Sequence, residues 1–319
     1  MAGVLVVITQ LATCACSQDK APIRIATNPW PGYEILHVAQ QQGFFKELGV
    51  KVQLVDFMSL ADSSRAFARG QVDAWGATLI ELLLNHANSN RVPQAFMVTD
   101  VSDGADMLLA RASITHLSNL KGKRVAVEPA TVNIVLLYHA LKSVNLSLKD
   151  VSLVSMPHSE MKQAIAEGRV DAICVYPPLS VDILKSKDLV TLFDSSKVKN
   201  LIVDVLAADP DILQERQADF VKITKAFERA RSFLQTHPDK AMAIISHREH
   251  ISVEELKRSL LGIRLVDNSE QRSFFQQHGL LDQATYSTMQ ALLITQQIFE
   301  SQVTHSVYSD QIISAMDRL

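Results

Sequence analysis

The hydrophobic and polar positions of the chain repeat one pattern. Short apolar runs alternate with amphipathic stretches over residues 23–75, and the same order recurs over residues 124–175. Short apolar runs are typical of buried strands, and the stretches between them have the 3.6-residue period of helices that cover a core. The pattern therefore predicts two β-α-β-α-β units, each with right-handed crossovers and a mainly parallel sheet.

A phrase of nine residues marks the repeat most clearly. Residues 66–74 read AFARGQVDA and residues 164–172 read AIAEGRVDA, with Gly70 and Gly168 separated by 168 − 70 = 98 positions. Each copy is typical of a helix that ends on a left-handed glycine and leads into a strand. Ligands of open α/β sheets bind at the carboxyl ends of strands, so we expect the residues just after each copy to face a ligand.

The remaining patterns complete the expected architecture. Strands are predicted at residues 94–98 and 107–110, and the apolar run at 201–207 predicts a strand that returns to the first unit. The chain is helical in pattern from Pro210 onward, and this part is expected to wrap the first unit.

These elements predict an α/β chain of two lobes with a ligand cleft between them. The expected first lobe comprises residues 21–110 plus 201–319, and the expected second lobe comprises residues 111–200. The lobes would close about a hinge near residues 100–112 and 200–208.

The first residues are typical of an export signal. The stretch from Met1 to Ala15 is apolar, too short to span a bilayer but long enough for the apolar region of a signal peptide. No Lys or Arg precedes it. Small residues before a cysteine, followed by polar residues, resemble a bacterial lipoprotein processing site. We therefore expect residues 1–16 to be a lipoprotein signal peptide with lipidated Cys16, or Cys14 as the alternative.

Composition and charge narrow the class of protein. The 319 residues are 47% hydrophobic and 20% charged, as in soluble globular proteins with one large or two medium domains. The net charge of −3 is interspersed and there is no basic stripe, which gives nucleic-acid binding no support. The three cysteines cannot build a disulfide framework or a metal cluster. We expect no metal and no cofactor.

Several short motifs, in a specific order, carry a resemblance to a known family. They are Trp30-Pro31-Gly32-Tyr33, Gln42-Gly43-Phe44-Phe45, Gly70-x-Val72-Asp73-Ala74, Asp103-Gly104-Ala105-Asp106 and Tyr176-Pro177-Pro178. With them the chain resembles the substrate-binding proteins of ABC importers for nitrate, taurine, alkanesulfonates and thiamine pyrimidine precursors. The resemblance covers nearly the whole mature chain and implies a type II periplasmic binding protein fold, whose lobes close over a ligand.

The resemblance also implies a function and partners. We expect an exported solute-binding protein of an ABC importer, lipid-anchored in the periplasm, that binds a sulfonate, an amine or betaine, or a pyrimidine precursor. Its expected partners are this small ligand and a membrane permease. It would touch the membrane only through its N-terminal lipid and act as a monomer. The same module could instead serve a membrane receptor as a ligand sensor, and both roles stay open.

An enzymatic role has less support. Pyrimidine-precursor synthases share the fold, and the resemblance implies that a relative of theirs would carry a cysteine cluster and an active-site histidine. Cys174 is the only cysteine after the N-terminal segment, and no nucleophile elbow, phosphate loop or metal-ligand spacing is present. We therefore expect no catalytic residues.

Residues near the predicted strand ends are candidates for ligand contact. Asn28, Trp30 and Tyr33 lie in the loop after the first strand. The flat ring of Trp30 could stack on a planar or cationic ligand, or it could instead plug the base of the loop. Thr78 and Tyr176 follow the two copies of the repeated phrase and are expected to form opposite walls of one cleft.

The polar candidate residues leave the sign of the ligand charge open, because some favour an anion and others favour a cation. Thr131 and Asn133 open a predicted helix, whose free N–H groups favour an anion, although Thr131 could serve only as an N-cap. Four acidic residues in or beside the cleft loops would instead favour an amine or a quaternary ammonium group. They are Asp103, Asp106, Glu128 and Asp204.

Overall fold

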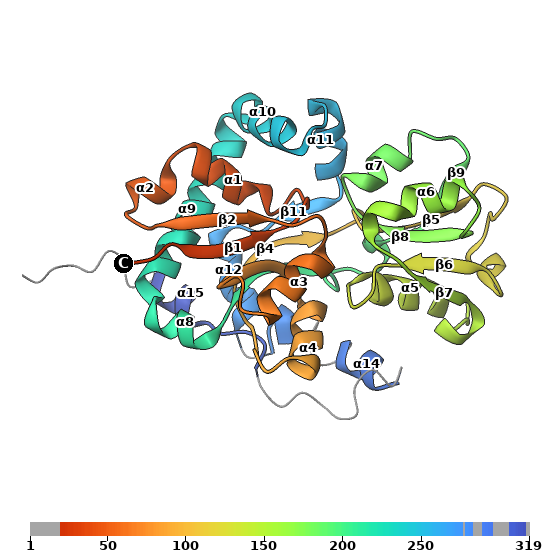
Figure 1. Ribbon diagram of the computed structural model, residues 1–319, viewed down its shortest axis with the longest axis horizontal. Coiled ribbons are helices and arrows are strands. Elements are labelled where there is room, and N and C mark those ends of the chain that lie inside the picture. The colour runs from red at the N-terminus through yellow and green to blue at the C-terminus, as the bar shows by residue number, and fades with distance from the viewer. Residues whose placement is uncertain (1–19, 277, 283–288, 296–305, 317–319) are drawn as a thin grey trace, which may run out of the picture.

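The computed structural model describes residues 20–276, 278–282, 289–295 and 306–316. Within these ranges the chain forms two lobes, each built on one sheet with helices on both faces (Figure 1). The predicted signal peptide and both candidate lipidation sites, Cys14 and Cys16, lie outside the described residues. None of the helices in the described ranges is long and apolar enough to cross a membrane.

The first lobe is built on a six-stranded sheet. Its strands are β1 (Ile23–Thr27), β2 (Val52–Asp56), β3 (Ala74–Thr78), β4 (Gln94–Ser102), β10 (Val203–Ala208) and β11 (Ile263–Leu265). In space their order is β11-β4-β10-β3-β1-β2. The strands of the first predicted unit, β1, β2 and β3, run parallel, whereas β10 pairs antiparallel with β3 and β4.

Helices cover both faces of this sheet. The helices outside the second lobe are α1 (Glu34–Gln41), α2 (Phe44–Glu47), α3 (Leu60–Ala68), α4 (Leu79–Asn88), α8 (Pro210–Glu215), α9 (Gln217–Thr236), α10 (Pro238–Glu249), α11 (Val253–Leu260), α12 (Asn268–Phe275), α13 (Leu280–Asp282), α14 (Ala291–Thr295) and α15 (Gln311–Met316). On one face α1, α9 and α10 enclose a core in which the Phe96 and Phe220 rings meet edge to face. On the other face α3 and α4 lie nearer the second lobe (Figure 1).

The second lobe is built on a five-stranded sheet. Its strands are β5 (Met107–Arg111), β6 (Arg124–Val127), β7 (Ser152–Ser155), β8 (Ala172–Val175) and β9 (Leu189–Asp194), and its helices are α5 (Asn133–Lys142), α6 (Met161–Ala166) and α7 (Leu179–Ile183). The space order is β7-β6-β8-β5-β9. β6 runs parallel to β7 and β8, while β5 pairs antiparallel with β8 and β9.

Two strands, β5 and β10, cross between the lobes, and the position of β5 corrects the expected boundary at residue 110. β5 lies in the second sheet, not in the first lobe where residues 107–110 were expected. The expected return of residues 201–207 to the first sheet does occur, as β10. A fully buried apolar strand fits either sheet, so its pattern does not reveal its partners. We propose that the lobes divide at the crossovers, residues 103–106 and 195–202.

The repeated phrase builds the same ion pair in both lobes. Asp73 accepts hydrogen bonds from the backbone N–H, Nε and Nη2 of Arg24, at 2.8, 3.1 and 2.7 Å. Asp171 accepts the same three bonds from Arg124, at 2.9, 3.1 and 2.9 Å. In each lobe the pair ties the first strand of the unit to the start of the third. The conserved geometry within the chain assigns this part of the phrase to the scaffold.

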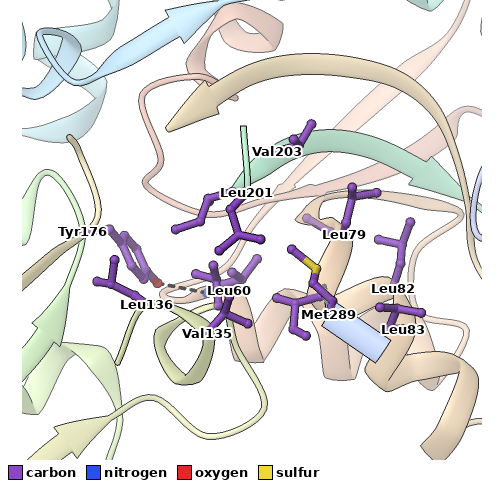
Figure 2. Packing of buried hydrophobic residues seen from close by; sticks show 14 of the residues in the cluster. Leu60, Leu79, Leu82, Leu83, Val135, Leu136, Tyr176, Leu201, Val203 and Met289 are labelled. Atoms are coloured by element: carbon purple, nitrogen blue, oxygen red, sulfur yellow. Dashed lines mark hydrogen bonds between the residues drawn. The ribbon is translucent and has the colours of Figure 1, made fainter. Parts of the chain in front are cut away.

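One apolar core runs through both lobes. Leu60 of α3 and Leu79 of α4 belong to the same cluster as Val135 and Leu136 of α5, and all four side chains are buried (Figure 2). Figure 2 also shows the Tyr176 hydroxyl directed at the backbone N–H of Leu60. Apolar packing across this contact excludes water and favours the closed arrangement of the lobes.

Replacing Asp73 tests its scaffold role. We expect Asp73→Ala to lower the free energy of unfolding by about 2 kcal/mol, because three donor groups of Arg24 lose a charged, partly buried acceptor. Glu47→Ala is the control, since Glu47 forms an exposed ion pair with Arg229 and its loss is expected to cost less than about 0.5 kcal/mol. Denaturant unfolding measures both values, and equal losses would contradict the assignment.

Candidate ligand-binding site

A small cavity lies between the lobes, beside the carboxyl ends of β3 and β8. Its volume is about 10 Å³, which is room for about one water-sized group. Strand ends of this kind are where open α/β sheets bind ligands. Both lobes contribute to its lining, which consists of Asn28, Trp30, Tyr33, Leu60, Thr78, Asp106, Val132, Tyr176 and Asp204.

The strand register brings the polar lining residues together. In the first sheet Asp204 on β10 pairs with Thr78 on β3 and with Asp100 on β4. In the second sheet the antiparallel pairing of β5 with β8 places Asp106 beside Tyr176. β10 therefore brings Asp204 beside Thr78, and the start of β5 brings Asp106 beside Tyr176. Thr78 and Tyr176 are the residues that come after the two copies of the repeated phrase.

Aromatic rings form the walls of the cavity. The rings of Trp30 and Tyr176 meet edge to face with centroids 6.1 Å apart, and Tyr176 stacks on His158 at 3.8 Å. Burial lowers the pKa of His158 to about 3, so a neutral ring supports Tyr176. Trp30 is only 4% exposed, and its Nε1 donates to Asp100 Oδ1 at 3.0 Å. The ring is thus a fixed wall of the cavity.

Two glycines make room for the site. A Cβ on Gly76 of β3 would lie 2.8 Å from the Tyr33 ring, and a Cβ on Gly32 would overlap the carboxylate of Asp100. Without these atoms, the Tyr33 ring lies over β3 and its hydroxyl donates to Asp204 Oδ1 at 2.6 Å. The glycines of the loop and strand therefore set where the polar groups lie.

Buried carboxyl groups surround the cavity. Burial raises the pKa of Glu81 to about 8, the pKa of Asp100 to about 7 and the pKa of Asp106 to about 6. Burial also raises the pKa of Asp204 well above its usual range, and the charge of Asp100 adds to that rise. Among the described residues no Lys, Arg or His lines the cavity, so no basic lining residue lowers these pKa values.

Two buried acceptors in the cavity have no hydrogen-bond partner within the described residues. They are Asn28 Oδ1 and Asp204 Oδ2, and each residue is 3% exposed. A buried polar atom without a partner costs about 1–3 kcal/mol. A ligand that donates hydrogen bonds to these two atoms would recover that cost.

Each lobe places a glutamate at a helix N-terminus of the other lobe. Glu81 of α4 accepts from the backbone N–H of Val132, at the start of α5, at 2.7 Å. Glu128, which follows β6, accepts from the N–H of Ala61 in the first turn of α3 at 3.2 Å and from the Tyr176 hydroxyl at 3.1 Å. Each contact gives a free N–H group of a helix N-terminus a hydrogen-bond acceptor, so both contacts stabilise closure. We call the pairs Glu81–Val132 and Glu128–Ala61 the interlobe clasp.

The structure brings most of the predicted site residues together. Those that line the cavity are Asn28, Trp30, Tyr33, Thr78, Asp106, Tyr176 and Asp204. Glu128 belongs to the clasp instead. Thr131 donates to the Glu128 carbonyl and Asn133 Oδ1 accepts from the Glu128 N–H, so these two side chains brace that loop. Asp103 is exposed in the first crossover.

Sequence reasoning missed four residues of the site, Leu60, Glu81, Asp100 and Val132. Glu81 follows Thr78 by three positions, which is the spacing of a capping box, and its Oε2 accepts from the Thr78 N–H at 2.8 Å. That spacing could have drawn attention to Glu81. The position of Asp100 depends on its pairing with Asp204, which no local pattern reveals.

A variant of Gly76 tests the fit of the Tyr33 ring. Gly76→Ala is expected to lower the free energy of unfolding by about 1–3 kcal/mol, because the added methyl group forces the ring out of its place. In a Tyr33→Ala background the same substitution should cost much less. An equal cost in both backgrounds, measured by denaturant unfolding, would show that the ring is not the cause.

The buried acids predict how stability depends on pH. Between about pH 7.5 and 9 the histidines of the unfolded chain are mostly neutral, and Glu81, whose pKa burial raises to about 8, binds its proton in the folded state and not in the unfolded state. The folded state therefore binds more protons, and the free energy of unfolding should fall as the pH rises through this window. Glu81→Gln should flatten the slope, and the exposed variant Asp211→Asn should not. A stability that rises over this window would contradict the burial argument.

Comparisons with known proteins agree with the two-lobed fold. A structure of the alkanesulfonate-binding protein SsuA of Xanthomonas axonopodis pv. citri bound to MOPS is similar with a TM-score of 0.75 at 16% identity, covering 89% of this chain and 96% of that one. The ligand-binding component of an ABC-type import system of Staphylococcus aureus, with zinc bound, has a TM-score of 0.76 at 15% identity, covering 94% and 100%. The predicted fold class is confirmed.

The same fold also occurs in an enzyme. The desulfurization enzyme DszB has a TM-score of 0.67 at 15% identity, covering 94% of this chain and 99% of that one. The fold alone therefore does not separate binding from catalysis.

A family model identifies the family, and sequence relatives agree with it. The chain is 25% identical over 239 residues to a Haemophilus influenzae protein proposed to act in thiamine biosynthesis, covering 73% of this chain and 74% of the relative. It is 23% identical over 260 residues to a proposed ABC transporter periplasmic binding protein of Brachyspira hyodysenteriae, covering 72% of each. The family model described as NMT1/THI5 like matches residues 30–241, from Trp30 of the site through the whole second lobe. The chain belongs to the NMT1/THI5-like family.

Proposed function

We propose that this protein is the substrate-binding component of an ABC import system and holds a small solute between its lobes. One observation carries the proposal: a cavity lined by both lobes contains the buried acceptors of Asn28 and Asp204, which have no partner among the described residues. The names of the Brachyspira hyodysenteriae relative and the Staphylococcus aureus structure support it.

Closure of the lobes is the step that would retain the solute. The interlobe clasp, the shared apolar core and an ion pair between Lys185, which follows α7, and Glu255 of α11 join the lobes. All of these contacts form only when the lobes meet. A membrane permease that recognises the closed surface is the partner that this role requires.

The names of the relatives also support a location outside the cytoplasm. Attachment through a lipid on Cys16, or on Cys14, would hold such a protein at the membrane surface. This anchor remains a prediction from the sequence.

The proposed role involves binding without chemical conversion. Cys174, the cysteine of the described residues, is fully buried in β8, and burial raises the pKa of its thiol. A thiol that stays protonated and out of reach of a ligand is a poor nucleophile. Turnover of any bound solute by the purified protein would contradict this part of the proposal.

A solute screen with two readouts tests the proposed function. Sulfonates, amines, betaines, pyrimidines and nitrate are added to the purified protein, and we expect at least one class to raise the Tm, because a ligand of the folded state stabilises it. The same solute should change the fluorescence of Trp30, which lines the cavity. Trp30→Phe should remove that change, and Trp75→Phe should not, since Trp75 stacks on Phe67 within the first lobe. If no class raises the Tm, the proposed function is wrong.

A further inference from the structure

We propose that the solute is a small organic cation whose N–H groups enter the cavity between Asn28, Asp106 and Asp204. The inference rests on the proposed function and names the ligand class for the same cavity. This ligand class differs from the sulfonates that the SsuA proteins are named for. The likeness of those proteins to this chain is limited to the fold.

Glutamate side chains already occupy the helix N-termini at the lobe contact. Free N–H groups at the start of a helix are the groups that bind a sulfonate or a carboxylate. Here Glu128 accepts from Ala61 of α3, and Glu81 accepts from Val132 at the start of α5. An anionic ligand would have to displace one of these glutamates and then lie beside the other carboxyl groups. The clasp therefore disfavours anions at the positions that would otherwise attract them.

The carboxyl groups at the cavity have no basic partner in its lining. Asp106 and Asp204 line it, and Asp100 and Glu81 each bind a lining residue directly. No basic side chain of the described residues lines it. Ionising a buried carboxyl group is costly, and a bound cation offsets that cost whereas an anion would increase it.

The acceptors select a cation that can donate hydrogen bonds. Asn28 Oδ1 and Asp204 Oδ2 line the cavity without partners among the described residues, and both are oxygen atoms. A primary ammonium or an amidinium group can donate to both, whereas a quaternary ammonium group has no N–H. The rings of Trp30 and Tyr176 add faces or edges that a cation can contact.

The dimensions limit the enclosed group and leave room for a longer molecule. The cavity of about 10 Å³ accommodates one ammonium-sized group. Tyr176 also lines an outer groove of about 420 Å³, together with Pro29, Met58 and residues of α7 and α11. A cation with a short carbon chain would place its head group in the cavity and its chain past Tyr176.

Proton exchange links this binding to pH. The titratable groups that face Asp204 are Tyr33, Glu81, Asp100 and Asp106. Arg264 of β11, which is paired with Glu270, acts on Asp100. Burial keeps these acids protonated above their usual pH range. A bound cation favours the ionised carboxylate, so binding releases a proton. The affinity for an amine should therefore rise between about pH 6 and 8, where these acids ionise.

Probes that share one carbon skeleton test the ligand class. Butylamine, butyltrimethylammonium and butane-1-sulfonate, with the matching benzyl and phenethyl sets, are titrated into the full chain by calorimetry. We expect binding by primary amines, at least tenfold weaker binding by the trimethylammonium compounds and none by the sulfonates. Asp204→Asn should weaken amine binding by about 30-fold or more, because a buried charge loses its partner. Asp211→Asn, at an exposed aspartate of α8, should leave it unchanged.

The outcomes separate this inference from the proposed function. Binding by sulfonates or pyrimidines without amines would overturn the cation inference and leave the proposed function in place. Absence of any bound solute, in these sets and in the wider screen, would overturn both. If Asp204→Asn does not fold, the pH profile of amine binding to the unaltered protein decides, and an affinity that falls from pH 6 to 8 would contradict the inference.

Discussion

Two buried glutamates, Glu81 and Glu128, join the lobes through the backbone of the helices opposite them. Burying a carboxylate is costly unless donors surround its oxygens. The N–H groups of Val132 and Ala61 are such donors, and each glutamate loses one of them when the lobes separate. The helix ends in turn lose an acceptor. Apolar packing around Leu60 also joins the lobes, while the clasp fixes their relative position.

Closure also determines the charge of the cavity. The same contact that provides donors for the glutamates removes water from Asp100, Asp106 and Asp204, whose pKa values rise because they are buried. These acids therefore hold protons, or meet a cation, when the lobes are closed. Lobe closure, protonation of these acids and binding of a charged ligand are therefore thermodynamically linked. A solute that brings positive charge lowers the cost of the closed state, and this is the physical basis of the inferred selectivity.

The sequence predicted the scaffold better than the contacts between its parts. The repeated phrase located Thr78 and Tyr176 at the cavity because a glycine-capped helix followed by a strand is a local pattern. The exchange of β5 and β10 could not be predicted, since an apolar strand such as Met107–Arg111 fits either sheet. Asp204 was a predicted site residue, but its position opposite Asp100 depends on the register between β10 and β4, which no local pattern reveals. The clasp joins residues far apart in the chain, and no periodicity encodes it.

The repeat explains how one scaffold can carry different ligand sites. Asn28 follows β1 as Glu128 follows β6, so the two residues hold equivalent places in the two units. Asn28 leaves an acceptor in the cavity, whereas Glu128 reaches across to α3. The Arg24–Asp73 and Arg124–Asp171 pairs are the same in both lobes because they serve the sheet. Ligand class therefore depends on the few positions where the halves differ, and these can change while the fold is retained.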